Sequence, residues 1–132
     1  MYQRPTSTTY NALELRELVG PVSTQYACVS CDSTVLAPDE ILQGKVEALG
    51  ISFNFAGCQN FDTVRVEGPP SQSPFLFFEL DRSSGTESGT QWEGTGPDFP
   101  FAWDPSSYEI VVTLIESDGT ESSPCPGMLT IQ

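Results

Sequence analysis

The sequence predicts one domain built mainly of β-strands. Three observations support this: a length of 132 residues, 11 Gly and 11 Pro, and short runs in which every second residue is apolar. One hydrophobic core usually serves about 100 to 200 residues, so a second full domain is not expected. Glycine and proline favour turns, and a period of two is typical of half-buried strands.

Residues 1–21 are expected to form a separate N-terminal unit. Residues 1–10 are polar and show no period, which predicts an extended arm. Asn11 as N-cap and Glu14 three positions later then predict a short helix that ends at Gly20. A helix of about eight residues is unstable alone, so it must dock on its own domain or on a neighbouring molecule. The candidate docking residues are Tyr2, Arg4, Tyr10, Leu15 and Leu18.

Residues 22–132 are expected to form the β domain. The stretch 39–49 could line a helix, but Gly44 at its centre favours a strand pair or a bent strand. The nearly continuous apolar run 75–80 predicts a central strand or one covered on both faces. The predicted strands are 22–29, 33–37, those within 39–49, 51–55, 64–66, 75–80, 90–93, 108–115 and 128–131.

The tract 81–98 reads as a loop. It is rich in glycine and contains one large apolar residue, Trp92, so we expect only a short strand at 90–93. The tip at 83–88 is the candidate for an exposed contact loop, and a solvated loop without a partner is the alternative. The candidate contact residues are Arg82, Glu87 and Trp92.

The C-terminal part carries a family resemblance. The run from Trp103 to Tyr108 leads into a long apolar strand, and Asp118-Gly119 then marks a hairpin. This pattern resembles the last two strands of immunoglobulin-like, fibronectin type III and PKD-type sandwiches, where a tyrosine hydroxyl bonds back to the preceding corner. The resemblance implies an all-β, immunoglobulin-like antiparallel β-sandwich, with Tyr108 at that corner. The Cys, Trp, Cys framework of antibody domains is missing.

Charge narrows the range of partners. The 18 acidic residues against 5 basic ones give a net charge of −13, which disfavours binding to nucleic acids and to anionic membranes. Residues 1–10 lack the apolar segment of a signal peptide, so we expect a chain made and kept in a cytoplasm. Reaching the exterior would require lysis, a dedicated secretion machine or a leader removed earlier.

Catalytic and metal chemistry is not expected. Without histidine, Ser/His/Asp and Cys/His arrangements and histidine-bearing zinc hydrolase sites are impossible. No motif marks a carboxylate pair, and no glycine-rich loop fits a phosphate. We therefore expect no enzyme and no cofactor. For calcium the candidates are Asp98 with Asp104, and Asp118 with Glu116 and Glu121, but solvated acidic turns are favoured.

The four cysteines leave several possibilities open. Cys28 and Cys31 form the only close pair, whereas Cys58 and Cys125 stand apart. A structural zinc site usually combines two close pairs, so buried thiols or one or two disulfides are favoured over zinc or a redox pair. Three complete pairings are possible, and the spacing does not choose among them.

The absence of catalytic motifs favours a structural role. We expect a virion structural protein, in particular a capsid decoration or cement protein of a tailed phage that docks on neighbouring capsid subunits. Its partners would be the major capsid protein or another virion protein, and copies of itself. The first alternative is a secreted or cell-surface immunoglobulin-like adhesion module with oxidised cysteines. The second is a small carbohydrate-binding module that uses Trp92 or Trp103.

Overall fold

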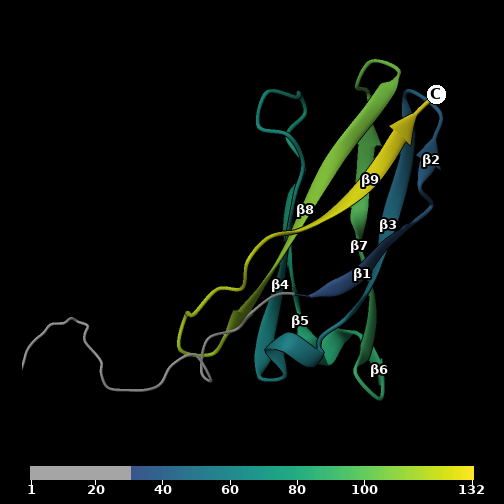
Figure 1. The fold of residues 1–132 in the computed structure, drawn as a ribbon. Coiled ribbons are helices and arrows are strands. Elements are labelled where there is room, and N and C mark those ends of the chain that lie inside the picture. Colours follow the sequence, from purple (N-terminus) through teal and green to yellow (C-terminus); the bar gives the residue numbers. More distant parts are fainter. Residues whose placement is uncertain (1–30) are drawn as a thin grey trace, which may run out of the picture.

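The computed structural model describes residues 31–132, which form two β-sheets facing each other (Figure 1). The sheets have the orders β1-β3-β7-β6 and β2-β9-β8-β4-β5. Neighbouring strands are antiparallel, except that β2 runs parallel to β9. The strands are β1 (Asp32–Ala37), β2 (Glu40–Ile41), β3 (Lys45–Asn54), β4 (Phe61–Glu67), β5 (Phe77–Asp81), β6 (Thr86–Ser88), β7 (Gln91–Phe101), β8 (Ser106–Glu116) and β9 (Cys125–Ile131).

One hydrophobic core lies between the sheets. Ile51 and Phe53 point inward from β3, and Ile110 and Val112 do so from β8, each at most 1% exposed. Their spacing of two confirms the alternation seen in the sequence, because successive side chains of a strand point to opposite faces. Burial of such a side chain contributes about 1.5 to 3 kcal/mol, so these strands supply much of the stability.

The ambiguous stretch 39–49 forms strands, as favoured. β2 ends at Ile41 and β3 begins at Lys45, with a turn between them. Gly44 in this turn has φ of 85°, a left-handed conformation that glycine adopts without steric cost. The turn is also held by the Gly44 amide, which donates to the Phe101 carbonyl oxygen at 2.6 Å. A helix over these residues is therefore excluded.

The expected tyrosine corner is present. The Tyr108 hydroxyl donates to the Asp104 carbonyl oxygen at 2.6 Å, just before β8 continues into the core. The Tyr108 ring also packs edge-on against Trp103, with the ring centres 5.0 Å apart. This confirms the role predicted for Tyr108.

The run 75–80 was wrongly predicted as a central strand. β5 is the last strand of the five-stranded sheet and pairs only with β4. Phe78 on its inner face and Leu76 just before the strand meet the core, whereas Phe75 and Phe77 are 46% and 49% exposed. The apolar run is therefore continuous because one face of this segment is buried and the other carries exposed aromatic rings.

The tract 81–98 is far more ordered than expected. It contains a short 3-10 turn, η3 (Arg82–Ser84), then β6 and the first part of β7. Its glycines provide space for aromatic rings: a Cβ atom on Gly94 would clash with the Trp92 ring, and one on Gly96 with the Phe78 ring. The glycine content that resembled a loop therefore serves close packing.

A disulfide joins Cys31, just before β1, to Cys125 at the start of β9, with Cα atoms 5.8 Å apart. Cys58, in the 3-10 turn η2 (Ala56–Cys58), is also disulfide-bonded, and residues 31–132 contain no free cysteine. Of the two favoured alternatives, buried thiols or disulfides, the structure has disulfides. No helix within residues 31–132 is long and apolar enough to cross a membrane. The expected arm and helix, strand 22–29 and the boundary after residue 21 lie outside the described residues.

Candidate functional site

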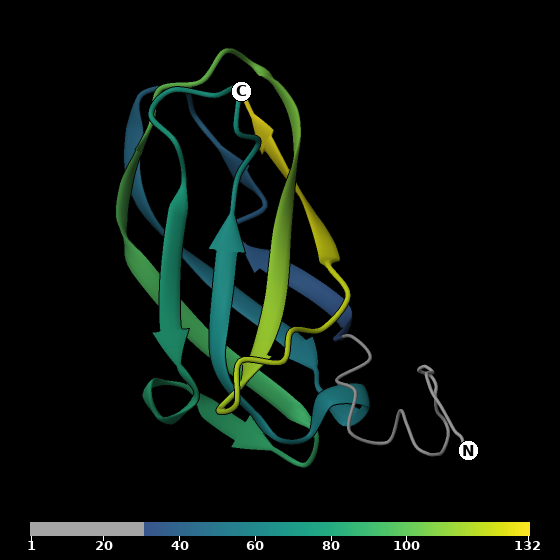
Figure 2. The same cartoon turned by 90° about the vertical axis from the view of Figure 1, so that its left-hand side faces the viewer.

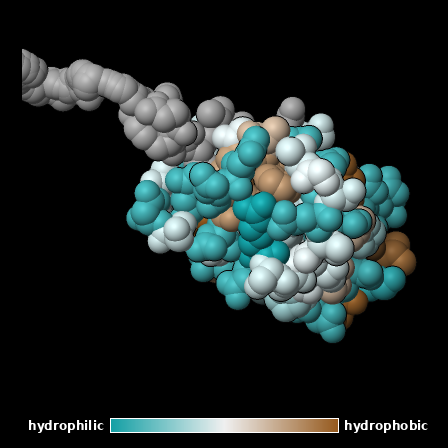
Figure 3. Space-filling view, turned by 90° about the horizontal axis from the view of Figure 1, so that it is seen from below, coloured by the Kyte–Doolittle hydropathy of each residue, from teal (hydrophilic) through white to brown (hydrophobic). Residues whose placement is uncertain are grey.

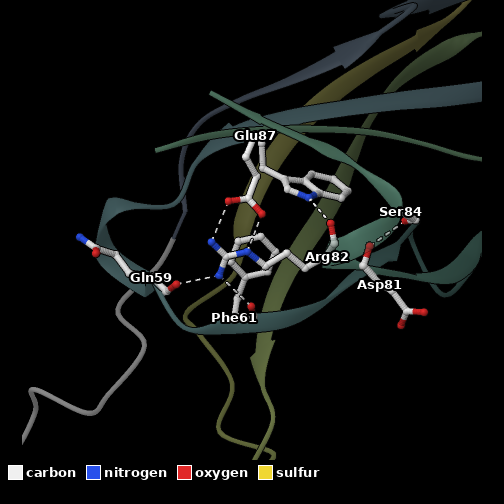
Figure 4. Close-up of polar contacts among 7 residues, drawn as sticks. Gln59, Phe61, Asp81, Arg82, Ser84 and Glu87 are labelled. Atoms are coloured by element: carbon white, nitrogen blue, oxygen red, sulfur yellow. Dashed lines mark hydrogen bonds and ion pairs between the residues drawn. The ribbon is translucent and has the colours of Figure 1, made fainter. Parts of the chain in front are cut away.

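The predicted contact residues Arg82 and Glu87 lie beside each other (Figure 4), at the lower end of the molecule in Figure 1, where β6 lies. Arg82 opens η3 directly after β5, and Glu87 lies in β6. The guanidinium holds the carboxylate with two bonds, Nε to Oε2 at 2.7 Å and Nη2 to Oε1 at 2.9 Å. This bidentate geometry is the strong form of an ion pair. It raises the pKa of Arg82 and lowers the pKa of Glu87.

The other side of the Arg82 guanidinium faces the segment that leads into β4. Its Nη1 donates to the carbonyl oxygens of Gln59 at 2.7 Å and of Phe61 at 3.1 Å. The cation also lies 4.7 Å from the Phe55 ring centre and 4.4 Å from that of Phe61. Arg82 therefore acts as a clamp that ties η3 and β6 to the turn before β4. Contact of Arg82 and Glu87 with a partner protein stays a prediction. Within the domain, the two charges are already paired with each other.

Trp92 was wrongly predicted as an exposed contact residue. Its side chain is 0% exposed and stacks on Phe53, with ring centres 5.3 Å apart. The indole Nε1 donates to the Arg82 carbonyl oxygen at 3.0 Å, which satisfies its polar group inside the domain. Burial follows from strand β7, which directs Trp92 into the core while Gly85 and Gly94 leave room for the ring.

The other tryptophan is equally unavailable to a ligand. Trp103 is 2% exposed, and its Nε1 donates to the Pro74 carbonyl oxygen at 2.8 Å. Phe101 and Phe99 pack against it from β7, with ring centres 5.6 and 5.9 Å away. Both tryptophans and Phe101 therefore belong to the core, and none of the three is exposed to stack on a sugar.

A shallow acidic hollow of about 430 Å³ lies next to the clamp. Within residues 31–132, no three carboxylates or thiols come together in a way that would hold a metal ion. Seen from below, this end of the molecule is covered mainly by hydrophilic and intermediate residues, with small separate hydrophobic spots (Figure 3). The hollow is lined by Asp62, Thr63, Asp81, Arg82, Ser83 and Glu87.

A second hollow of about 560 Å³ lies on the outer face of the four-stranded sheet. Its floor consists mainly of short side chains, including Ala37, Ala48 and Ser52 from β1 and β3. Glu47 and Glu93 are its only titratable residues, so it offers little chemistry beyond shape and negative charge.

The exposed aromatic pair was missed by sequence reasoning. Phe75 and Phe77 are stacked, with ring centres 6.2 Å apart, at the start of β5. A usable signal was present, because Glu79 interrupts the apolar run and a strand covered on both faces has no place for a carboxylate. The described residues include six large hydrophobic side chains that are well exposed: Val35, Leu42, Val46, Phe75, Phe77 and Met128.

The predicted docking residues of the N-terminal unit lie outside the described residues, so their role stays a prediction. They are Tyr2, Arg4, Tyr10, Leu15 and Leu18.

Comparison with known proteins finds likenesses among solved structures. No protein-family model matches the chain, and no curated protein matches it. Among solved structures, the chain is similar to chitinase ChiW from Paenibacillus sp. str. FPU-7, described as a bacterial cell-surface-expressed multi-modular enzyme machinery. The two share 14% identity with a TM-score of 0.47. The match covers 97% of this chain and 11% of the chitinase chain.

Proposed function

We propose that this protein is a non-enzymatic, immunoglobulin-like interaction module that works outside a reducing cytoplasm, secreted or at a cell surface. The observation that carries the proposal is the oxidised state of the cysteines. Cys31 and Cys125 are bonded to each other, and Cys58 is also in a disulfide. Disulfides persist in oxidising compartments and are rare in the cytosol.

The immunoglobulin-like assignment is supported by the connections between strands. β1 pairs with β3 in one sheet, whereas β2, directly after it, joins β9 in the other. Two sheets with the orders β1-β3-β7-β6 and β2-β9-β8-β4-β5, antiparallel apart from the β2–β9 pair, are the arrangement expected for this class of sandwich. The Tyr108 corner supports the same assignment.

A protein-binding role is supported by what the exterior offers. The net charge of −13 and the absence of histidine leave few routes to catalysis. The exposed Phe75 and Phe77 stack on each other and give an apolar contact surface. Apolar side chains that gather on a surface are typical of interaction sites.

The cysteines and the single lysine, Lys45, provide the test. Intact cells of the source organism are treated with an impermeant amine reagent, then with an alkylating agent, before tryptic digestion without reductant. We expect labelling of Lys45, whose side chain is 59% exposed. Trypsin does not cut after a modified lysine, so we also expect peptides 17–65 and 83–132, which contain Cys31 and Cys125, to stay covalently joined until reductant is added. Recovery from the cytosol with both thiols alkylated would contradict the proposal.

The second candidate is a decoration protein on the head of a tailed phage. It is favoured by the net charge of −13, which would keep particles apart in solution if carried on the outer surface. The disulfide is compatible with this location, because oxidation can follow lysis. Co-sedimentation with phage particles in a density gradient is the expected result. A monomer that never enters the particle band contradicts it.

A further inference from the structure

The outer edge of β5 has no strand beside it within the described part of the chain. β5 is the terminal strand of its sheet and lies beyond β4 (Figure 2). The Gly68 amide donates to the Leu76 carbonyl oxygen at 2.9 Å, which fixes the phase of the β4–β5 ladder. Antiparallel hydrogen bonding alternates, so Phe78 and Leu80 bond toward β4, whereas the main-chain groups of Phe77 and Glu79 point away from it.

Phe77 makes this edge unusual. Its side chain is 49% exposed and stacks on Phe75, which is 46% exposed. Natural proteins usually protect a free sheet edge with charges, proline or a covering segment, because exposed apolar edges recruit other chains. Here the aromatic pair borders directly on the open main-chain groups. The edge therefore offers both hydrogen bonds and apolar contact to an added strand.

The charged residues around Phe77 indicate which side chains the added strand carries. The outward side chains beside Phe77 are Glu67, Glu79 and Asp81, and Arg65 already pairs with Glu79 at 3.4 Å and with Glu121 at 3.1 Å. A second copy of β5 would bring equal negative charges together across the new pair, which is unfavourable. A strand with basic side chains would meet them favourably.

We propose that the free edge of β5 binds an extended segment of a partner protein as an additional strand. Phe75, Phe77, Glu79 and Asp81 are spaced by two and share one face, so the segment carries apolar residues in one half and basic residues in the other. The apolar half would contact Phe75 and Phe77, and the basic half would face Glu79 and Asp81. Main-chain bonds would give affinity, and this order of side chains would give specificity. This inference rests on the proposed function and names the class of partner for it.

The test uses the full oxidised chain labelled with ¹⁵N and two nine-residue peptides with neutral ends. One peptide has lysines in its N-terminal half and valines in its C-terminal half, so that as an antiparallel strand it sets lysine against Glu79 and Asp81 and valine against Phe75 and Phe77. The other peptide has the same composition with the two residue types alternating, which offers one type to all four side chains. We expect the block peptide to bind about tenfold more tightly and to slow amide exchange at Phe77 and Glu79 about tenfold, with Phe78 unchanged. Equal binding of both peptides without protection at Phe77 and Glu79 would overturn the inference.

Two variants of Glu79 distinguish the contribution of main-chain pairing to peptide binding from the contribution of charge. Glu79→Pro removes an amide that points to the free edge, and the β4 ladder does not use that amide. Glu79→Gln removes the same charge and keeps the amide. We expect Glu79→Pro to abolish protection of Phe77 by the block peptide and Glu79→Gln to retain it. Equal behaviour of the two variants would show that charge alone acts, which also overturns the inference.

The outcomes distinguish this inference from the proposed function. Suppose that the protein is found oxidised at the cell exterior but its β5 edge gains no protection from the peptide. The proposed function then stands, and the proposed strand binding at the β5 edge is refuted. A cytosolic protein with free thiols refutes the proposed function, whatever the peptides do.

Discussion

Arg82 shows how one side chain can fix a chain segment that has little apolar surface of its own. β6 is three residues long, and all of them are exposed, so burial contributes little to its position. The guanidinium replaces that contribution with four hydrogen bonds and two ring contacts. The fork of donors is specific to arginine, because a lysine ammonium could not reach the carboxylate and both carbonyls in this geometry.

The first prediction compares Arg82 with Arg65. Arg82→Ala should lower the free energy of unfolding by about 2 kcal/mol, because the carbonyl oxygens of Gln59 and Phe61 lose a charged donor and two rings lose a cation. Arg65→Ala is the control. It removes contacts to Glu79 and Glu121 at the surface and should cost below about 1 kcal/mol. Urea unfolding measures both, and a larger cost for Arg65→Ala would contradict the clamp.

The second prediction concerns acid. The bond to Arg82 lowers the pKa of Glu87 below its ordinary value of 4.5, so folding favours the ionised carboxylate. The resulting stabilisation is complete above the ordinary pKa and is lost as pH falls through the lowered one. The stability difference between the wild type and Glu87→Gln should therefore shrink between about pH 6 and about pH 3. Urea titrations at each pH measure it, and a constant difference would contradict the assignment.

At the scale of elements, β7 depends on glycine to accept the aromatic rings of the core. The Trp92 ring lies where a Cβ atom on Gly85 or Gly94 would be, and the Phe78 ring occupies that place at Gly96. Glycine weakens a strand because it loses more conformational entropy on folding than other residues do. In β7 the dense packing of the rings offsets that cost.

The third prediction follows from this packing. Gly94→Ala should destabilise the domain by about 1 to 3 kcal/mol, because the new methyl group overpacks against Trp92. Gln91→Ala, at an exposed position of the same strand, is the control and should have little effect. Near-ultraviolet circular dichroism reports on the Trp92 environment, and thermal unfolding reports on the stability. Equal stability of the two variants would contradict the overpacking argument.

The sequence predicted elements best where a strand has one buried and one exposed face. The alternation of Ile51 and Phe53, and the long strand after Tyr108, are confirmed because the core enforces a period of two. Predictions failed where tertiary contacts give a residue a different role. The rings that pack over Gly94 and Gly96 cannot be inferred from the neighbouring sequence. The tract 81–98 was therefore predicted as a loop.

The candidate site was less predictable than the fold. Arg82 and Glu87 were identified as contact residues, but their mutual pairing depends on how η3 and β6 fold back. The exposure of Phe77 depends on β5 being the last strand, which is a property of strand order and not of any local pattern. Strand order arises from long-range pairing, so a single sequence indicates it weakly.

For the whole molecule, the central feature is the covalent closure by Cys31 and Cys125. The bond joins positions 94 residues apart, immediately before β1 and at the start of β9. Closing so long a loop restricts the unfolded chain strongly, which favours the folded state. A small domain that works outside cells gains most from such a bond, because it cannot enlarge its core.

The fourth prediction tests this closure. The double variant Cys31→Ala with Cys125→Ala should lower the free energy of unfolding by roughly 3 to 5 kcal/mol and reduce the urea midpoint. Cys58 is left intact in this variant, so the loss belongs to the one bond. The wild type measured without reductant is the reference. A midpoint equal to the wild type would mean that the bond adds nothing to stability.

The same bond determines how the domain responds to mechanical force. Tension between residue 31 and residue 132 passes through the sulfur atoms into β9 and bypasses residues 32–124. Extension is then limited to residues 126–132, which span roughly 25 Å when fully stretched. A module held at these two positions in flowing liquid, or between moving surfaces, would act as a nearly inextensible link. Most of the chain would keep its shape under a load that unravels an unbridged sandwich.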